Sequence, residues 1–226
     1  MNTDQEIQQS FNKNKYVVIK QFLPEQVALL AYEYCKLKVI RADWLSQVEG
    51  SGYRADLDGT FGDKQIPNSY NCYGDPMMEA MLSLTTPLLE KFTGLKLTPQ
   101  YSYWRFYQTG DVLARHTDRG SCEISTTLCL GANNDNIDKN VYPDYKWPMW
   151  VVDSEGNEVP AALEPGDLIV YKGCEVEHWR EKFQGLNQAQ VFLHYNTVGG
   201  EFDYIFDGRP QLGLPFTAKD DSKILR

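Results

Sequence analysis

The sequence has no long apolar run, since none of its stretches approaches the roughly 18 residues that a membrane-spanning helix requires. Its first fifteen residues, MNTDQEIQQSFNKNK, are polar and lack the apolar centre of a secretory signal peptide. We therefore expect a cytoplasmic protein that has no membrane partner.

Cysteine and basic residues are also scarce. The five cysteines are odd in number, and no two of them form a C-x-x-C pair. This argues for reduced thiols, and against a disulfide framework or a cysteine zinc site. Acidic residues outnumber Lys and Arg by 31 to 22, which gives a net charge of −9. Because phosphate binding needs a basic surface, we expect no nucleic-acid partner.

The chain is long enough to bury a core, with 226 residues of which 42% are hydrophobic. We expect one domain over residues 1–226, in three parts. Residues 1–94 form a helical support with a long loop, residues 95–198 form a β core, and residues 199–226 form a tail that packs on the core. Apolar spacing predicts helices over 23–44 and 76–94.

Short runs rich in β-branched and aromatic residues follow one another between residues 95 and 198, separated by turn signals. The runs are 96–108, 112–116, 123–131, 148–153, 158–164, 167–173, 174–180 and 188–196. Short strands at this spacing are typical of a two-sheet jelly roll or barrel. The sequence therefore predicts an α+β protein, with N-terminal supporting helices and a double-stranded β-helix (jelly-roll or cupin-like) core.

Histidine is the scarcest chemically informative residue, with only three copies in the chain. His116 and Asp118 form a His-x-Asp pair, and His178 lies on a later strand. In a jelly roll these three side chains meet as the 2-His-1-carboxylate triad of non-haem Fe(II) sites. The alternatives are a turn with a hydrogen-bonded imidazole and a core histidine; the combination on this scaffold favours a metal site. We expect His194 to be a packed or surface residue.

The segments YWRFYQTGDVLARHTDRGSCEISTTLCLG, LEPGDLIVYKGCEVEHWRE and QAQVFLHYN resemble the Fe(II)/2-oxoglutarate-dependent oxygenases. The prolyl 4-hydroxylase-like branch is the most similar, and within it a microbial and phage-associated subgroup. The resemblance covers residues 95–198 well and the first third loosely. It implies that His116, Asp118 and His178 bind Fe(II), and that 2-oxoglutarate and O2 are co-substrates.

The resemblance also implies residues that hold the far carboxylate of 2-oxoglutarate. In the prolyl hydroxylase pattern these are a tyrosine nine residues before the first ligand and a threonine on the strand after the His-x-Asp pair. Tyr107 and Thr126 occupy these places. Thr126 is equally well explained as a β-former in a strand.

The basic residue of the family pattern is missing, because Gln188 stands about ten residues after the distal histidine, where Lys or Arg is expected. Arg180 offers a replacement, since it lies two residues after His178 and would share its face of a strand. A guanidinium can bind a carboxylate through two nitrogens. The alternative is a surface arginine paired with an acidic neighbour. Arg105, on the same strand face as Tyr107, is the other candidate.

These features predict a dioxygenase that hydroxylates an unactivated C–H bond, in an amino acid or a peptidyl residue, and releases succinate and CO2. The retained Asp118 favours hydroxylation over halogenation, in which related enzymes have a small residue at that place. We expect a small-molecule or peptide substrate and leave the oligomeric state open. The alternative is a jelly-roll metal-binding or sensing module, or a cupin enzyme that uses its metal only as a Lewis acid. A basic residue opposite the triad would distinguish the two.

Overall fold

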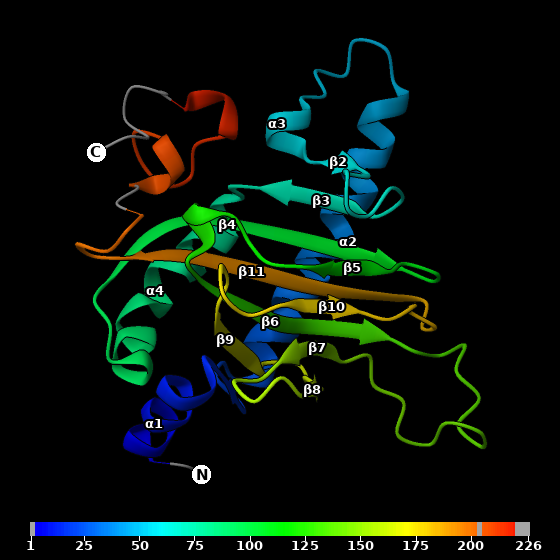
Figure 1. Ribbon diagram of the computed structural model, residues 1–226. Coiled ribbons are helices and arrows are strands. Elements are labelled where there is room, and N and C mark those ends of the chain that lie inside the picture. The colour runs from blue at the N-terminus through cyan, green and yellow to red at the C-terminus, as the bar shows by residue number, and fades with distance from the viewer. Residues whose placement is uncertain (1–2, 203–204, 220–226) are drawn as a thin grey trace.

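The computed structural model describes residues 3–202 and 205–219 (Figure 1). The α-helices are α1 (Asp4–Asn14), α2 (Glu25–Gln47), α3 (Ala55–Asp58) and α4 (Pro76–Thr93). The strands are β1 (Tyr16–Ile19), β2 (Thr60–Phe61), β3 (Tyr70–Tyr73), β4 (Leu97–Gln108), β5 (Leu113–His116), β6 (Ile124–Asn133), β7 (Met149–Val152), β8 (Glu158–Ala161), β9 (Leu168–Lys172), β10 (His178–Arg180) and β11 (Asn187–Thr197). Short 3-10 helices span Gly120–Cys122, Phe206–Gly208 and Phe216–Ala218.

The strands form two antiparallel sheets. The larger has the order β1-β9-β6-β11-β4-β3-β2, and the smaller has the order β5-β10-β7-β8. From β4 onward the chain passes back and forth between the sheets, which is the connectivity of a double-stranded β-helix. All the strands predicted between residues 95 and 198 are present, so the predicted α+β fold with a jelly-roll core is confirmed.

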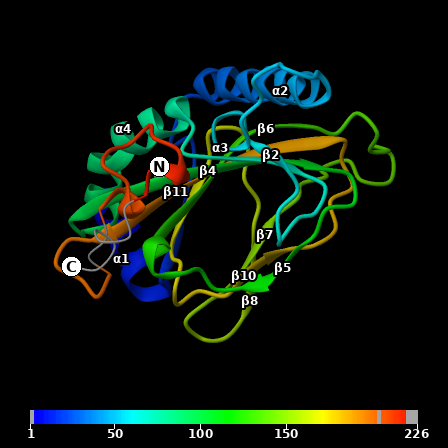
Figure 2. The same ribbon diagram turned by 90° about the horizontal axis from the view of Figure 1, so that it is seen from above.

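The helices cover one face of the larger sheet, and the smaller sheet lies across the opposite face (Figure 2). Buried apolar side chains from α1, α2, α4 and the larger sheet form the main core. The space between the two sheets holds smaller apolar clusters together with polar side chains. The polar interior of the barrel is therefore separated from the apolar core by the larger sheet itself.

Local sequence signals explain where the helices begin and end. Asp75 caps α4 by accepting hydrogen bonds from the backbone N–H groups of Met77 and Met78, and Gly94 ends the helix in the left-handed conformation. The helix α1 was not predicted, although Thr3 and Glu6 form a reciprocal capping box at its start. This pattern is a recognised helix-start signal.

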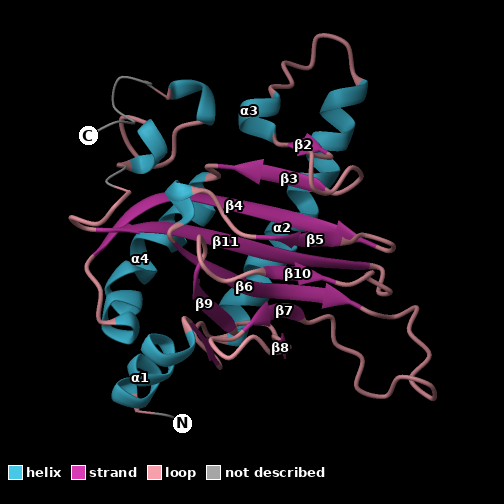
Figure 3. Cartoon of the chain, in the orientation of Figure 1, coloured by secondary structure: helices cyan, strands magenta, loops and turns pink. Residues whose placement is uncertain are grey.

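The long loop expected within residues 1–94 corresponds to residues 46–76, which contain α3, β2 and β3. The strand β3 pairs with β4 from Tyr70 to Tyr73, so this segment extends the larger sheet beside the barrel opening. By contrast, the connection between β6 and β7 extends away from the barrel over about residues 135–144 (Figure 3) and returns to it at Trp147, which is buried. The part of residues 46–76 next to the barrel opening forms regular strands because the backbone of β3 pairs with that of β4.

The C-terminal segment packs against α4 and β4. Arg209 donates hydrogen bonds to the carboxylate of Glu79 at 2.7 Å and to the backbone oxygen of Gln100 at 2.8 Å, and the Arg209 and Glu79 side chains are almost completely buried. Residues 203–204 and 220–226 of the predicted tail lie outside the described residues. Among the described helices, none has the length and apolar character needed to cross a membrane.

Candidate metal centre

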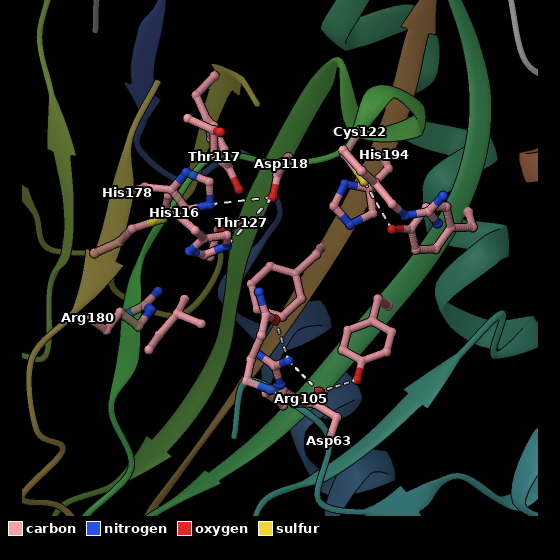
Figure 4. A pocket seen from close by; sticks show the side chains of 18 residues that line it. Asp63, Arg105, His116, Thr117, Asp118, Cys122, Thr127, His178, Arg180 and His194 are labelled. Atoms are coloured by element: carbon pink, nitrogen blue, oxygen red, sulfur yellow. Dashed lines mark hydrogen bonds and ion pairs between the residues drawn. The ribbon is translucent and has the colours of Figure 1, made fainter. Parts of the chain in front are cut away.

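The side chains of His116, Asp118 and His178 converge at one end of the barrel (Figure 4). His116 ends β5 and is the cross-strand partner of His178 on β10, so the pairing of these strands brings the two rings together. Their Nε2 atoms lie 3.8 Å and 3.6 Å from Asp118 Oδ1. One donor atom from each residue lies within 4.8 Å of the others. The arrangement has the composition and spacing of a 2-His-1-carboxylate site.

Backbone hydrogen bonds set the tautomer of both histidines. Nδ1 of His116 lies 2.8 Å from the carbonyl oxygen of Ala114, and Nδ1 of His178 lies 2.9 Å from that of Val176. Because a carbonyl only accepts, both Nδ1 atoms carry a proton, and the Nε2 lone pairs face Asp118. Burial, followed by the neighbouring His178, lowers the pKa of His116. A neutral imidazole suits metal binding.

A serine and a third histidine orient Asp118. The hydroxyl of Ser125 donates to Asp118 Oδ2 at 2.7 Å, and Nδ1 of His194 lies 2.9 Å from the same hydroxyl oxygen. Burial acts to raise the pKa of Asp118, but the neighbouring histidines and Ser125 lower it overall. His194 is packed, as one of the two predicted alternatives had it, but it also faces the cavity. Ser125 was not among the residues predicted from the sequence.

Gly173 allows the loop that carries Asp118 to approach β9 closely. The N–H of Asp118 donates to the Gly173 carbonyl oxygen at 2.8 Å. A Cβ atom at residue 173 would lie 2.6 Å from Asp118 Oδ2 and 2.2 Å from the carbonyl oxygen of Cys122. Any side chain here would displace the carboxylate, so this glycine is part of the site.

The triad opens into a cavity of about 400 Å³ between the two sheets. This volume lies in the range of small-molecule sites. The cavity walls include Arg105, Thr127, Arg180 and His194, which come from β4, β6, β10 and β11 (Figure 4). All four side chains are largely buried, so a ligand here would be held in a low-dielectric environment.

Arg180 points into this cavity with almost no solvent exposure. Its Nη1 donates to the backbone oxygen of Trp147 at 2.9 Å, and its guanidinium lies 4.7 Å from the centre of that indole ring. Within the described residues, Nε and Nη2 have no hydrogen-bond partner and no carboxylate pairs with the side chain. The alternative of a surface pair is therefore wrong: Glu177 pairs with Arg115 on the outside of the barrel.

Arg105, the other predicted anchor, also faces the cavity but already has a counter-charge. Its Nη2 donates to Asp63 and to Gln65 Oε1, and its Nη1 donates to the Tyr107 hydroxyl at 3.4 Å. Burial alone would lower the pKa of Arg105, but its tyrosine and aspartate neighbours raise it overall. Both arginines keep a buried Nε without a hydrogen-bond partner among the described residues, but only Arg180 of the two also has an unpartnered Nη2 and no carboxylate paired with it.

Neither of the two residues predicted from the prolyl hydroxylase pattern, Tyr107 and Thr126, lines the cavity. Tyr107 is fully buried between the sheets, where its ring packs edge-on against Trp147. Thr126 does not line the cavity, because its side chain leaves β6 on the helix side and hydrogen bonds with the backbone of Leu193. The next residue, Thr127, lines the cavity instead. Gln188 occupies β11 opposite Tyr107, so no cation stands there.

Comparison with solved structures identifies this architecture. A prolyl-4-hydroxylase from Pseudomonas putida aligns with a TM-score of 0.62 and 15% identity, over 86% of this chain and 99% of that protein. The non-haem α-ketoglutarate-dependent carbocyclase SnoK from nogalamycin biosynthesis gives a TM-score of 0.63 and 11% identity, over 86% and 84%. The fold is that of the Fe(II)/2-oxoglutarate oxygenases.

Iron-bound EctD from S. alaskensis aligns with the same fold, with a TM-score of 0.58 and 14% identity, over 94% of this chain and 83% of EctD. No protein-family profile and no curated protein matches the sequence. At these identities the likeness establishes the fold alone. The chemistry therefore has to be argued from the side chains in the cavity.

Proposed function

We propose that the protein is an Fe(II)- and 2-oxoglutarate-dependent dioxygenase that hydroxylates an unactivated C–H bond. The observation that carries this proposal is the pairing of a His-Asp-His triad with a buried guanidinium that lacks a counter-charge among the described residues, in one cavity. A metal-binding module without turnover, or an enzyme using its metal only as a Lewis acid, needs the triad but not the cation. A co-substrate with a second carboxylate needs both.

The donor set fits Fe(II). Fe(II) would be held by the imidazoles of His116 and His178, whose Nε2 lone pairs are directed inward, and by the ionised carboxylate of Asp118. When bound, iron would supply the oxidising chemistry that converts the substrate C–H, O2 and 2-oxoglutarate to the hydroxylated substrate, succinate and CO2. The protein orients the ligand side chains, because Ser125 and Gly173 hold the Asp118 carboxylate in position.

The cavity also fits 2-oxoglutarate. Burying an arginine without a counter-charge is costly, and a bound carboxylate would remove that cost through charge-assisted hydrogen bonds. We assign the far carboxylate to Arg180, with Thr127 on the facing sheet in place of Thr126. Tyr107 does not line the cavity, and we assign it an indirect role, because its hydroxyl accepts a hydrogen bond of 3.4 Å from Arg105, whose side chain does line the cavity. In this assignment the basic residue for the far carboxylate lies on β10 and not on β11.

The substrate is proposed to be an amino acid, free or within a peptide. Asp63, Arg105 and Arg119 line the cavity in addition to the co-substrate residues, and would present both signs of charge to a zwitterionic or peptidic group. The SnoK structure shows that this fold also accommodates a carbocyclase, so the outcome of oxidation has to be determined on the product itself. Hydroxylation adds one oxygen atom to the substrate, whereas ring closure removes two hydrogen atoms.

The experiment is to measure succinate release under air from purified protein, Fe(II) and 2-oxoglutarate with a panel of amino acids and peptides, followed by product mass. We expect one substrate class to stimulate succinate release and to gain one oxygen atom. His116→Ala and Asp118→Ala should abolish both signals, whereas Arg115→Met on the outer face should retain them. Absence of any Fe(II)-dependent 2-oxoglutarate consumption across the panel would contradict the proposal.

A further inference from the structure

The outer face of α2 carries a stripe of large apolar side chains that the fold leaves in solvent. Leu30, Leu37, Ile40 and Trp44 are 65%, 67%, 64% and 60% exposed. The opposite face of the same helix packs on the larger sheet through small residues that are fully or almost fully buried, namely Ala28, Ala31, Cys35 and Ala42. A helix that is apolar on both faces is normally buried on both.

The stripe has the spacing of a helix–helix contact. Leu30, Leu37 and Trp44 recur every seven residues, and Ile40 lies between the last two on the same side. Fourteen residues of α-helix make the stripe about 21 Å long. Exposed apolar side chains gathered on one face often mark an interaction site. This face therefore has the properties of an interface.

We propose that the stripe is the contact between two copies of this chain, packed with their α2 helices antiparallel about a two-fold axis at Leu37. The sequence is complementary to itself about this residue. Seven positions before and after Leu37 stand Leu30 and Trp44, which are both large and apolar. An antiparallel pair places Leu30 against Trp44 of the second copy twice, and Leu37 against its own counterpart.

Charges on the same helix select the antiparallel arrangement. Four positions before and after Leu37 stand Glu33 and Arg41, which have opposite charges. An antiparallel pair places Glu33 near Arg41 of the second copy on both sides of the axis, whereas a parallel pair would place each charge beside its like. Both side chains are accessible, with 59% of Glu33 and 62% of Arg41 exposed, and the ion pair of Glu33 with Lys36 on the same helix is itself exposed. Arg41 binds Asp58 through one nitrogen only, so other donors are available.

This contact lies apart from the cavity, because α2 lies on one side of the larger sheet, and β5 and β10, which carry His116 and His178, lie on the other (Figure 2). The proposal does not depend on the proposed enzymatic function. Dimerisation would cover the apolar stripe and leave the barrel opening free in both copies. Variants on this face should therefore change assembly without changing metal binding.

The test is sedimentation equilibrium of the full chain over a range of concentrations. We expect a particle of about twice the 25.9 kDa chain mass, and a dissociation constant raised at least tenfold by Leu37→Glu, with unchanged circular dichroism. The matched control is Leu84→Glu on α4, where an apolar side chain is 75% exposed but lies outside the stripe; this variant should remain dimeric. A wild-type chain that stays monomeric at the highest concentration overturns the proposal.

A charge swap tests the orientation. Glu33→Arg alone and Arg41→Glu alone should each weaken the dimer, because each creates two like-charge contacts across the axis. The double variant should regain the wild-type dissociation constant, since it restores both opposite-charge pairs in reverse. Additive weakening in the double variant, or a dimer insensitive to Leu37→Glu, would reject the antiparallel contact.

Discussion

Arg180 lies two residues after His178 on β10, and both side chains enter the same cavity. The alternation of a strand brings them to one face, so a single short strand supplies a metal-ligand candidate and the cation beyond it. In the family pattern the cation stands on β11, where this chain has Gln188. The exchange keeps a basic group inside the barrel while changing the strand that carries it.

Replacing Arg180 should separate co-substrate binding from metal binding. We expect Arg180→Met to weaken 2-oxoglutarate binding by about 100-fold, since hydrogen bonds to charged groups contribute roughly 1.5–3 kcal/mol. Arg180→Lys should lie between Met and wild type, because it keeps the charge and loses the two-nitrogen geometry. Isothermal titration with a redox-inert divalent metal measures the metal affinity, and titration of the metal-loaded protein with 2-oxoglutarate measures the co-substrate affinity. Unchanged 2-oxoglutarate affinity in Arg180→Met would refute the assignment.

The same variant should stabilise the ligand-free protein. Removing a buried charge that has no counter-charge lowers the cost of folding, so the free energy of unfolding of Arg180→Met should rise by about 1–2 kcal/mol. Arg115→Met, at an exposed ion pair, should change it by less than about 1 kcal/mol. Denaturant unfolding without metal or 2-oxoglutarate measures both values. A destabilised Arg180→Met protein would show that the guanidinium is already well satisfied.

The neighbouring threonines on β6 give a matched pair. Thr127→Val should weaken 2-oxoglutarate binding by about tenfold, the value of one hydrogen bond, because Thr127 lines the cavity. Thr126→Val should leave that affinity unchanged and lower the free energy of unfolding by about 1 kcal/mol, because its hydroxyl bonds the backbone of Leu193. If Thr126→Val weakened 2-oxoglutarate binding and Thr127→Val did not, the assignment of Thr127 to the co-substrate would be wrong.

Ser125 should act on the metal through Asp118. Ser125→Ala removes the hydroxyl that donates to Asp118 Oδ2 at 2.7 Å, and we expect metal affinity to fall by about 10–100-fold. The control is Ser102→Ala, a buried serine on β4 whose hydroxyl has no hydrogen-bond partner among the described residues. Competition with a chromophoric chelator measures Co(II) affinity in each. If Ser125→Ala and Ser102→Ala bound Co(II) with equal affinity, Ser125 would have no role in orienting Asp118 for the metal.

Asp207 should give the protein a pH-dependent component of stability. Burial acts to raise the pKa of Asp207, but Arg119, Lys219 and Tyr73 outweigh it and hold the pKa well below its usual value. The unfolded chain protonates near pH 4, so this stabilisation is complete above about pH 5 and is lost as the pH falls toward the lower folded value. Stability should therefore rise with pH across this window.

Asp207→Asn measures this effect. At pH 7 we expect Asp207→Asn to lower the free energy of unfolding by about 2 kcal/mol. The loss is limited to this value because the Arg119 side chain is 54% exposed and solvent screens its charge. The difference between variant and wild type should shrink as the pH falls below about 4. Thermal unfolding at several pH values follows it. A difference that stays constant with pH would mean that the carboxylate contributes packing and not charge.

The strands and the clustering of His116, Asp118 and His178 could be predicted from patterns of residue type and spacing. Runs of β-formers separated by turns mark each strand, and a His-x-Asp pair followed by one distant histidine is typical of an Fe(II) site on such a scaffold. The helix α1 was equally readable from Thr3 and Glu6. The inward direction of Arg180 followed from strand alternation with His178.

The choice between Thr126 and Thr127 was not readable. The strand β6 is buried on both faces over most of its length, so its sequence shows no alternation between polar and apolar positions. A single-residue register error then exchanges the cavity face for the core face. The close approach of Gly173 to Asp118 depends on how the end of β9 packs against the loop that carries Asp118. No local sequence pattern predicts this contact.

The most direct test of the account is an anaerobic titration of the protein with Fe(II) and then 2-oxoglutarate, followed by visible absorption. We predict a weak charge-transfer band that saturates at one iron per chain, is absent from His116→Ala, and in Arg180→Met requires far higher 2-oxoglutarate concentrations. A featureless spectrum from wild-type protein with iron bound would contradict the claim that this cavity holds iron and 2-oxoglutarate together.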